Sequence, residues 1–373
     1  MKTLKRIAVV LVAFVIVELV ALSFKGNDIM DRSIILGLGV DKKDDDILLT
    51  AEIVSPGNGS EQVGTYSKIV SAKGASLGEA LSKISEQTGK EASLGQCVFV
   101  VLGQEYFENH DFSDTIDYLI NSNSFKESST ISCCQGSAQQ LLNSAEALSR
   151  SVSLSLVRML REQAQNVGIP SNVLLDYTRS QRELYKTGYL NYIRYVPSQN
   201  TDTENPDKPQ GYFLYDQVCI FKQNKYVCTL STSQTKGFAL LYKKTSGDTF
   251  VSDNGGNKQT VTVNDKKVDV KLKDDAINVD VKLFVRLARA DSTQTGGIFA
   301  SKNQKEISQG VMQDVQLQAS SLVQEFLQLQ QEKDFDIVNF HEAFRQKHGT
   351  TQYIATLPML QIPVSFTVTL TEK

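Results

Sequence analysis

The chain has 373 residues, of which 41% are hydrophobic and 22% charged, and its formal net charge is -3 at pH 7. These values are ordinary for a folded protein and exclude an extended disordered chain. No basic stripe is present, so nucleic-acid binding is not expected, because phosphate contacts require clustered Lys and Arg side chains.

Residues 1–25 are predicted to be a targeting segment. Three basic residues among the first six precede an apolar run from Ile7 to Ser23 that only Glu18 interrupts. A basic cap before such a run is typical of export or membrane insertion. The run fits a signal peptide cleaved after Ala21-Leu22-Ser23, and it reaches the length of a membrane anchor only with Glu18 included. We favour the uncleaved signal-anchor, which places the remaining chain on the extracytoplasmic side.

Residues 30–196 alternate between strand and helix patterns. Period-two alternation and short apolar runs predict strands at 33–40, 47–55, 65–72, 97–102, 129–134 and 189–196. Helical spacing predicts helices at 77–86, 112–120, 138–149, 154–167 and 171–185. We expect one α+β region here, or two subdomains that divide near 135–150.

A stretch rich in Pro, Asn and Asp, 197–211, is predicted to be a linker to a second α+β domain, 212–373. The elements expected in that domain are a hairpin at 212–230, a helix at 231–241, alternating strands within 260–289, a long amphipathic helix at 305–331, a helix at 337–344 and a strand at 362–370. Segregated helices and hairpins favour the α+β class, with two to three subdomains, mixed or antiparallel sheets and flanking helices.

Two cysteines fall on the strands of the predicted hairpin. If Gln223 and Asn224 are the two loop residues, Cys219 lies directly opposite Cys228 in a non-hydrogen-bonded pair, where Cα atoms approach to about 4.5 Å. A disulfide tolerates that distance. The pair is therefore either a disulfide or two buried thiols, and we favour the thiols.

The sequence Gly74-Ala-Ser-Leu-Gly78 matches the nucleophile elbow of serine hydrolases. However, Ser76 and Glu79 also form a capping box, in which the serine accepts from a free helical N–H group and the glutamate reaches back. The same pattern recurs at Ser137 with Gln140, and again at 301–304. We interpret these serines as helix N-caps, with no catalytic residue among them.

The segment Gly37-Leu-Gly39-Val-Asp41 lacks the third glycine of a dinucleotide loop and opens no helix. We expect a strand that runs into a charged turn. The acidic cluster 41–46 lacks the spaced Gly and Glu of a calcium loop and is expected to be a solvated turn. No metal or cofactor site is predicted.

Several stretches, in their order and spacing, resemble the Ger(x)C family, the C-subunit of spore nutrient-germinant receptors. In the N-terminal half they are Asp31-Arg-Ser-Ile34, Gly37-Leu-Gly-Val-Asp41, Leu49-Thr-Ala-Glu-Ile-Val-Ser-Pro56, Ser71-Ala-Lys-Gly-Ala-Ser-Leu-Gly-Glu-Ala80, Leu94-Gly95 and Val98-Phe-Val-Val-Leu-Gly103. In the C-terminal half they are Val218-Cys-Ile-Phe-Lys222, Thr235-Lys-Gly-Phe238 and Asp334-Phe-Asp-Ile-Val-Asn-Phe340.

The resemblance implies a non-enzymatic subunit on the outer surface of the spore inner membrane. Its partners would be a polytopic transporter-like subunit and a second integral-membrane receptor subunit. Family members usually carry a lipobox cysteine before the first strand, and this chain has none. The N-terminal helix is therefore expected to hold the protein at the membrane. The alternatives are a generic extracytoplasmic binding or scaffold protein and, less favoured, a surface serine hydrolase that uses Ser76.

Overall fold

The computed structural model describes the following residues: 14, 18, 32–55, 66–122, 124–145, 151–166, 168, 172–197, 211–242, 247–254, 257–273, 276–287, 301–340, 342–343 and 361–371. Within these ranges no helix combines the length and apolarity needed to cross a membrane. The predicted targeting segment lies outside them, apart from the helical residues Phe14 and Glu18.

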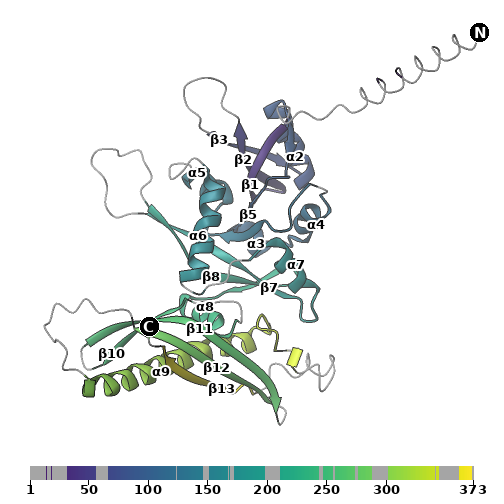
Figure 1. Ribbon diagram of the computed structural model, residues 1–373. Helices are drawn as coiled ribbons and strands as arrows, with labels where there is room; N and C mark the ends of the chain where they lie inside the picture. Colours follow the sequence, from purple (N-terminus) through teal and green to yellow (C-terminus); the bar gives the residue numbers. More distant parts are fainter. Residues whose placement is uncertain are drawn as a thin grey trace, which may run out of the picture.

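The first sheet is mixed and has nine strands, in the order β3-β2-β1-β5-β6-β7-β8-β9 with β4 beside β1 (Figure 1). Its strands are β1 (Arg32–Lys43), β2 (Asp46–Ser55), β3 (Tyr66–Gly74), β4 (Glu91–Ser93), β5 (Phe99–Gly103), β6 (Thr130–Cys134), β7 (Thr187–Pro197), β8 (Gly211–Lys222) and β9 (Lys225–Thr229). The central strands β1, β5, β6 and β7 are parallel, and the outer pairs are antiparallel.

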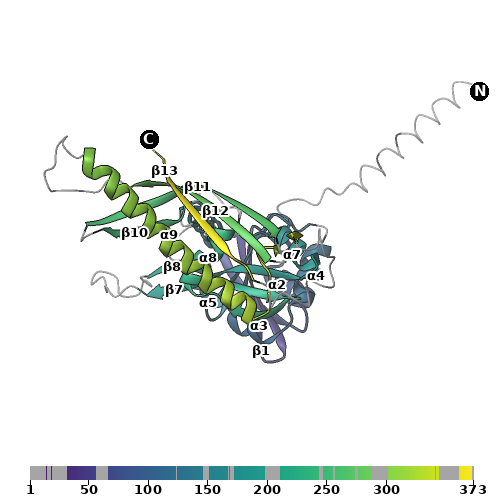
Figure 2. The ribbon, with the colours of Figure 1, turned by 90° about the horizontal axis from the view of Figure 1, so that it is seen from below.

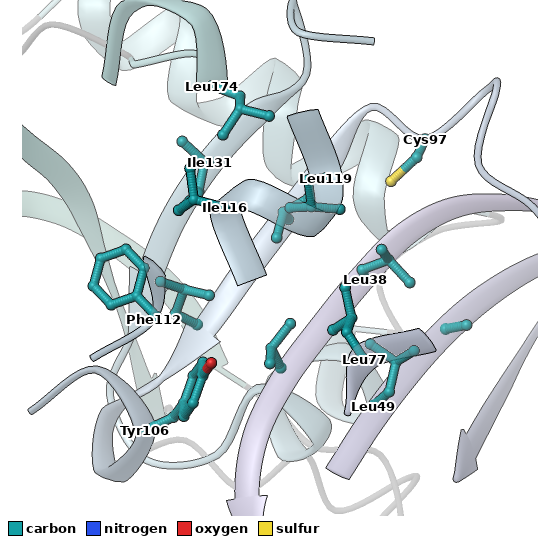
Figure 3. Close-up of a cluster of buried hydrophobic side chains, with 14 of the residues drawn as sticks. Leu38, Leu49, Leu77, Cys97, Tyr106, Phe112, Ile116, Leu119, Ile131 and Leu174 are labelled. Atoms are coloured by element: carbon teal, nitrogen blue, oxygen red, sulfur yellow. The ribbon is translucent and has the colours of Figure 1, made fainter. Parts of the chain in front are cut away.

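Helices cover both faces of this sheet. One face is covered by α2 (Leu77–Thr88), α3 (Gln104–Asn109), α4 (Ser113–Asn121) and α7 (Leu174–Arg182), and the other by α5 (Ala138–Ala145) and α6 (Val152–Asn166). In β5, Val100 and Leu102 pack on the first face while Phe99 and Val101 pack on the second. Burial of both faces explains why this strand is a continuous apolar run. Figure 3 shows the first core, where Leu38 and Leu49 of the strands lie near Leu77 of α2.

The second sheet has the order β10-β11-β12-β13, with β13 parallel to β12. Its strands are β10 (Thr249–Asn254), β11 (Asn257–Lys273), β12 (Ala276–Leu287) and β13 (Val364–Leu370). The long helix α9 (Ser301–Glu332) runs along it and packs against β10, β13 and α8 (Thr232–Leu241) (Figure 2). The predicted helix over 337–344 is wrong at its start, because Asn339 has a left-handed φ of 63° and residues 337–339 are not helical.

The two sheets share a core rather than meeting across a linker. The segment predicted as a domain linker, 197–211, joins β7 to its antiparallel neighbour β8, so the first sheet continues across it. Tyr189 and Ile220 of these strands pack in the same cluster as Phe238 of α8 and Phe326 of α9. The Pro- and Asn-rich composition indicates a loop, but composition alone does not distinguish a long hairpin connection from a boundary between domains.

Candidate functional site

A buried carboxylate at the end of β1 holds the start of α5. Asp41 is 6% exposed and accepts hydrogen bonds from the backbone N–H groups of Ala138 and Gln139, both at 2.8 Å, and from Ser137 Oγ at 2.9 Å. Burial raises the pKa of the Asp41 carboxyl above its ordinary value, although these hydrogen bonds oppose the shift. The expectation of a solvated turn is therefore wrong for Asp41; the turn itself is at Asp44 and Asp45.

A second buried carboxylate holds the start of α6 in the same way. Glu52 of β2 has no exposed surface and accepts from the backbone N–H groups of Val152, at 2.9 Å, and Ser153, at 2.8 Å. The first N–H groups of a helix have no partner within the helix and carry partial positive charge. Each carboxylate therefore satisfies two such donors and fixes one helix on the sheet.

Glycines in β1 provide the room that these helix starts need. A Cβ atom at Gly37 would lie well inside van der Waals contact with Ser153 Oγ, and one at Gly39 would lie 3.1 Å from Ala138 Cβ. The alternation Gly-x-Gly-x-Asp thus places two glycines and Asp41 on the strand face toward α5 and α6. Sequence analysis missed this role, although the glycine spacing and a glutamate inside the apolar strand β2 were visible signals.

The predicted N-cap of α2 is confirmed. Ser76 Oγ accepts from the Glu79 backbone N–H at 3.2 Å, and Glu79 Oε2 accepts from the Ala75 N–H at 2.9 Å, one residue earlier than in a standard capping box. This arrangement engages the serine hydroxyl at the helix start and fits the structural interpretation of Ser76.

The second predicted capping box differs in its bonds. Ser137 Oγ accepts from Gln139 N at 3.2 Å, whereas the prediction assigned the reciprocal role to Gln140. The Asp41 carboxylate takes the main capping position there. A complete capping box occurs instead at Ser231 and Gln234 of α8, which the sequence analysis did not identify.

The cysteine hairpin has the predicted loop but not the predicted register. Gln223 and Asn224 adopt φ angles of 54° and 58°, and a two-residue type I′ hairpin turn requires a positive φ at both of its central residues. A bulge at Val227 then shifts the pairing, so that Cys219 lies opposite Thr229 and Ile220 lies opposite Cys228. The predicted register is therefore wrong, and both cysteines are free thiols. An extra residue in one strand displaces every pair beyond it.

An ionic cluster ties the first sheet to the end of α9. Lys222 Nζ donates to the Asp334 carbonyl oxygen at 2.8 Å and to Asp334 Oδ2 at 2.7 Å, and it lies 4.5 Å from the centre of the Tyr185 ring. The Tyr185 hydroxyl donates to Asp334 Oδ1. Burial and the neighbouring Asp334 carboxylate raise the pKa of Tyr185, so the phenol remains a hydrogen-bond donor.

A second cluster fixes the start of α8 to the sheet. Arg194 Nη2 donates to Asp216 Oδ1 at 2.6 Å, and Thr232 Oγ1 donates to Asp216 Oδ2 at 2.8 Å. Although burial opposes ionisation, these hydrogen bonds hold the pKa of Asp216 below its ordinary value. In the part of the chain that the structure describes, no group of three or more His, Cys, Asp or Glu side chains is arranged to hold a metal ion. The polar clusters described above connect strands to helices through hydrogen bonds and ion pairs, and we interpret them as structural.

Comparisons with known proteins agree with this arrangement. A family model described as "Spore germination protein N-terminal domain" matches residues 25–195, and one described as "Spore germination B3/ GerAC like, C-terminal" matches residues 216–372. No curated protein matches the chain. The crystal structure of the GerBC protein is similar in fold, with a TM-score of 0.54 and 14% identity over 90% of this chain and 97% of that one. The chain therefore belongs to the Ger(x)C family of spore germination proteins.

Proposed function

We propose that this protein is the C-subunit of a spore nutrient-germinant receptor and acts without catalysis. The observation that carries the proposal is the match of two spore germination family models, in order, to both halves of the chain. The buried carboxylates and ionic clusters support it, because they connect strands to helices and rigidify a body suited to assembly with other subunits.

The body is proposed to lie on the extracytoplasmic side of the spore inner membrane, tethered by residues 1–25. The basic cap and the apolar run from Ile7 to Ser23 support this orientation. Because the chain has no lipobox cysteine before β1, the helix itself is proposed as the anchor. The proposed partners are two integral-membrane receptor subunits, one of them transporter-like.

Co-purification from spore membranes tests partners and compartment together. The full chain with a C-terminal affinity tag would be isolated from detergent-solubilised spore membranes, and spores lacking the gene would be scored for nutrient response. We expect integral-membrane subunits to co-purify and the response to be lost, with restoration by the wild-type gene. Unchanged germination together with no co-purifying membrane subunit would refute the proposal.

The N-terminal peptide of the same preparation tests the anchor. An N-terminus at Met1 or Lys2 on the membrane-bound protein is the expected result. A mature N-terminus at Phe24 would show cleavage after Ser23 and would overturn the anchor while leaving the receptor proposal intact.

A further inference from the structure

One face of the long helix α9 is exposed and almost free of charge. The opposite face packs in the core through Val311, Val315, Ala319, Val323 and Phe326. Between 309 and 328 the exposed positions are, apart from Glu325, uncharged: Gln309, Gln313, Gln316, Leu317, Ser321, Gln324 and Gln328. The helix runs along the lower side of the molecule in Figure 1 and lies in front of the sheets in Figure 2. Exposed helix faces usually carry charged side chains, whereas the centres of protein–protein interfaces are depleted of them. The absence of charge therefore favours contact with another chain.

Leu317 lies in the middle of this face. Its side chain is 65% exposed, more than any other large hydrophobic side chain in the described ranges. A seam of four residues at intervals of four, three and four positions passes through it: Gln313, Leu317, Ser320 and Gln324. This is the spacing of a coiled-coil seam, in which two helices pack at about 20° to each other. Glu325, at the margin of the face, is engaged by α8, since its Oε1 accepts from Ser233 Oγ at 2.8 Å. The seam thus fits a second helix.

The seam is complementary to itself in the antiparallel direction. With a two-fold axis between Ser320 and Ser321, each of these serines faces the other in the second copy. Both are small, and Ser320 Oγ already donates to the Gln316 carbonyl oxygen at 2.8 Å, so the helices can approach closely at the axis. One turn away, Leu317 lies opposite Gln324 of the second copy, whose methylene groups offer it apolar surface.

The ends of the seam pair neutral amides. In the same arrangement Gln313 lies opposite Gln328 of the second copy, once on each side of the axis. Gln328 Nε2 donates to Glu332 Oε1 at 2.8 Å within its own helix, and the Gln328 carbonyl oxygen can accept from the Gln313 amide. Identical surfaces repel each other when they carry charges of one sign. This seam carries none, so it can meet its own copy.

We propose that this face of α9 pairs antiparallel with the same face of a second copy of the chain. Such an interface is isologous, because every contact between one residue and another occurs twice, once on each side of the axis. From Gln313 to Gln328 the contact covers about 24 Å of helix, at 1.5 Å per residue. A contact of one helix per partner is small, so the dimer forms and dissociates with concentration. The pairing joins identical chains and does not depend on membership of a receptor.

Paired charge variants test the proposal by sedimentation equilibrium of the purified full chain in a non-ionic detergent. Gln313→Lys/Gln328→Lys places like charges opposite each other at both ends of the seam, whereas Gln313→Glu/Gln328→Lys places opposite charges there. We expect a concentration-dependent dimer for the wild type and the Glu/Lys variant, with association at least about 10-fold weaker for the Lys/Lys variant. Equal association of the two double variants, or a wild type that remains monomeric, would overturn the proposal.

Cysteine cross-linking tests the direction of pairing. Ser320→Cys lies at the axis and should give a disulfide-linked dimer on mild oxidation. Gln313→Cys should not link to itself, because antiparallel pairing separates the two copies of this position by about 22 Å along the helix. It should link instead to Gln328→Cys in a mixture of the two variants. The wild type and Glu86→Cys, at an exposed position of α2, report background linkage. A Gln313→Cys homodimer as abundant as that of Ser320→Cys would refute the antiparallel assignment.

Co-purification from spore membranes separates self-association from contact with a receptor subunit. If the wild type is monomeric and the Lys/Lys variant loses its integral-membrane subunits, the face belongs to one of those subunits and pairing between copies is refuted. A dimer that forms from a chain with no co-purifying subunit would support the pairing while the receptor proposal fails.

Discussion

The buried carboxylate of Glu52 should be worth several kcal/mol of stability although it lies on a strand remote in sequence from the helix that it holds. It accepts two backbone N–H groups of α6 at 2.9 and 2.8 Å and has no exposed surface. Glutamine at this position keeps the shape but offers one neutral acceptor, and its NH₂ group meets the second N–H donor. A buried donor left without a partner costs about 1–3 kcal/mol, and bonds to charged acceptors exceed neutral ones by roughly 1 kcal/mol. We therefore expect Glu52→Gln to lower the free energy of unfolding by about 2–4 kcal/mol.

Urea unfolding followed by circular dichroism measures this change, with Glu86→Gln on the exposed face of α2 as the matched control. The control should fall within about 0.5 kcal/mol of the wild type. Hydrogen exchange adds a local readout, because the amides of Val152 and Ser153 should exchange faster in Glu52→Gln than in the control. A loss below about 0.5 kcal/mol for Glu52→Gln, with unchanged exchange at these amides, would refute the reasoning.

Three further predictions concern other parts of the fold. Burial lowers the pKa of Lys266 to about 7. Above that pH the unfolded chain therefore binds more protons than the folded protein. The free energy of unfolding should rise between about pH 7 and 10 by up to about 1.4 kcal/mol per pH unit. In urea titrations at several pH values Lys266→Met should lose this rise and Lys282→Met should keep it; a parallel pH profile for Lys266→Met and the wild type would contradict the assignment. At Gly237 a Cβ atom would lie 2.7 Å from the backbone carbonyl carbon of Leu322 in α9, so Gly237→Ala should lower the free energy of unfolding by about 1–3 kcal/mol. Gly95→Ala, whose Cβ would have no contact below 3.6 Å, should be tolerated. Equal midpoints of urea unfolding for the two variants would count against close packing of α8 on α9. Mass spectrometry after alkylation in denaturant should find five free thiols, whereas a chain 2 Da lighter with two unlabelled cysteines would show a disulfide. In the native protein Cys228 should react slowly at pH 7, because burial raises its pKa to about 11.

Local patterns predicted most of the regular structure. The apolar run at β5, the helical spacing in α2, the cap at Ser76 and the loop residues Gln223 and Asn224 all depend on neighbours within a few positions, and each is confirmed. Short elements such as β4, α3 and β10 were not predicted, because three to six residues carry too little periodicity to stand out.

Long-range features could not be predicted in the same way. Asp41 and Glu52 bond to helix starts about 100 positions later in the chain, so nothing adjacent to them indicates their role. The bulge at Val227 changes the partner of Cys219 without any local mark that distinguishes it from a regular strand.

The placement of β8 and β9 in the first sheet has a consequence for how the chain is made. These strands end at Thr229, so the sheet that begins at Arg32 remains incomplete until nearly two hundred further residues have been synthesised. Until then β7 is an open edge with unpaired backbone groups, and such edges promote aggregation. The nascent chain is therefore prone to aggregate until β8 and β9 have been synthesised and the open edge of β7 is paired.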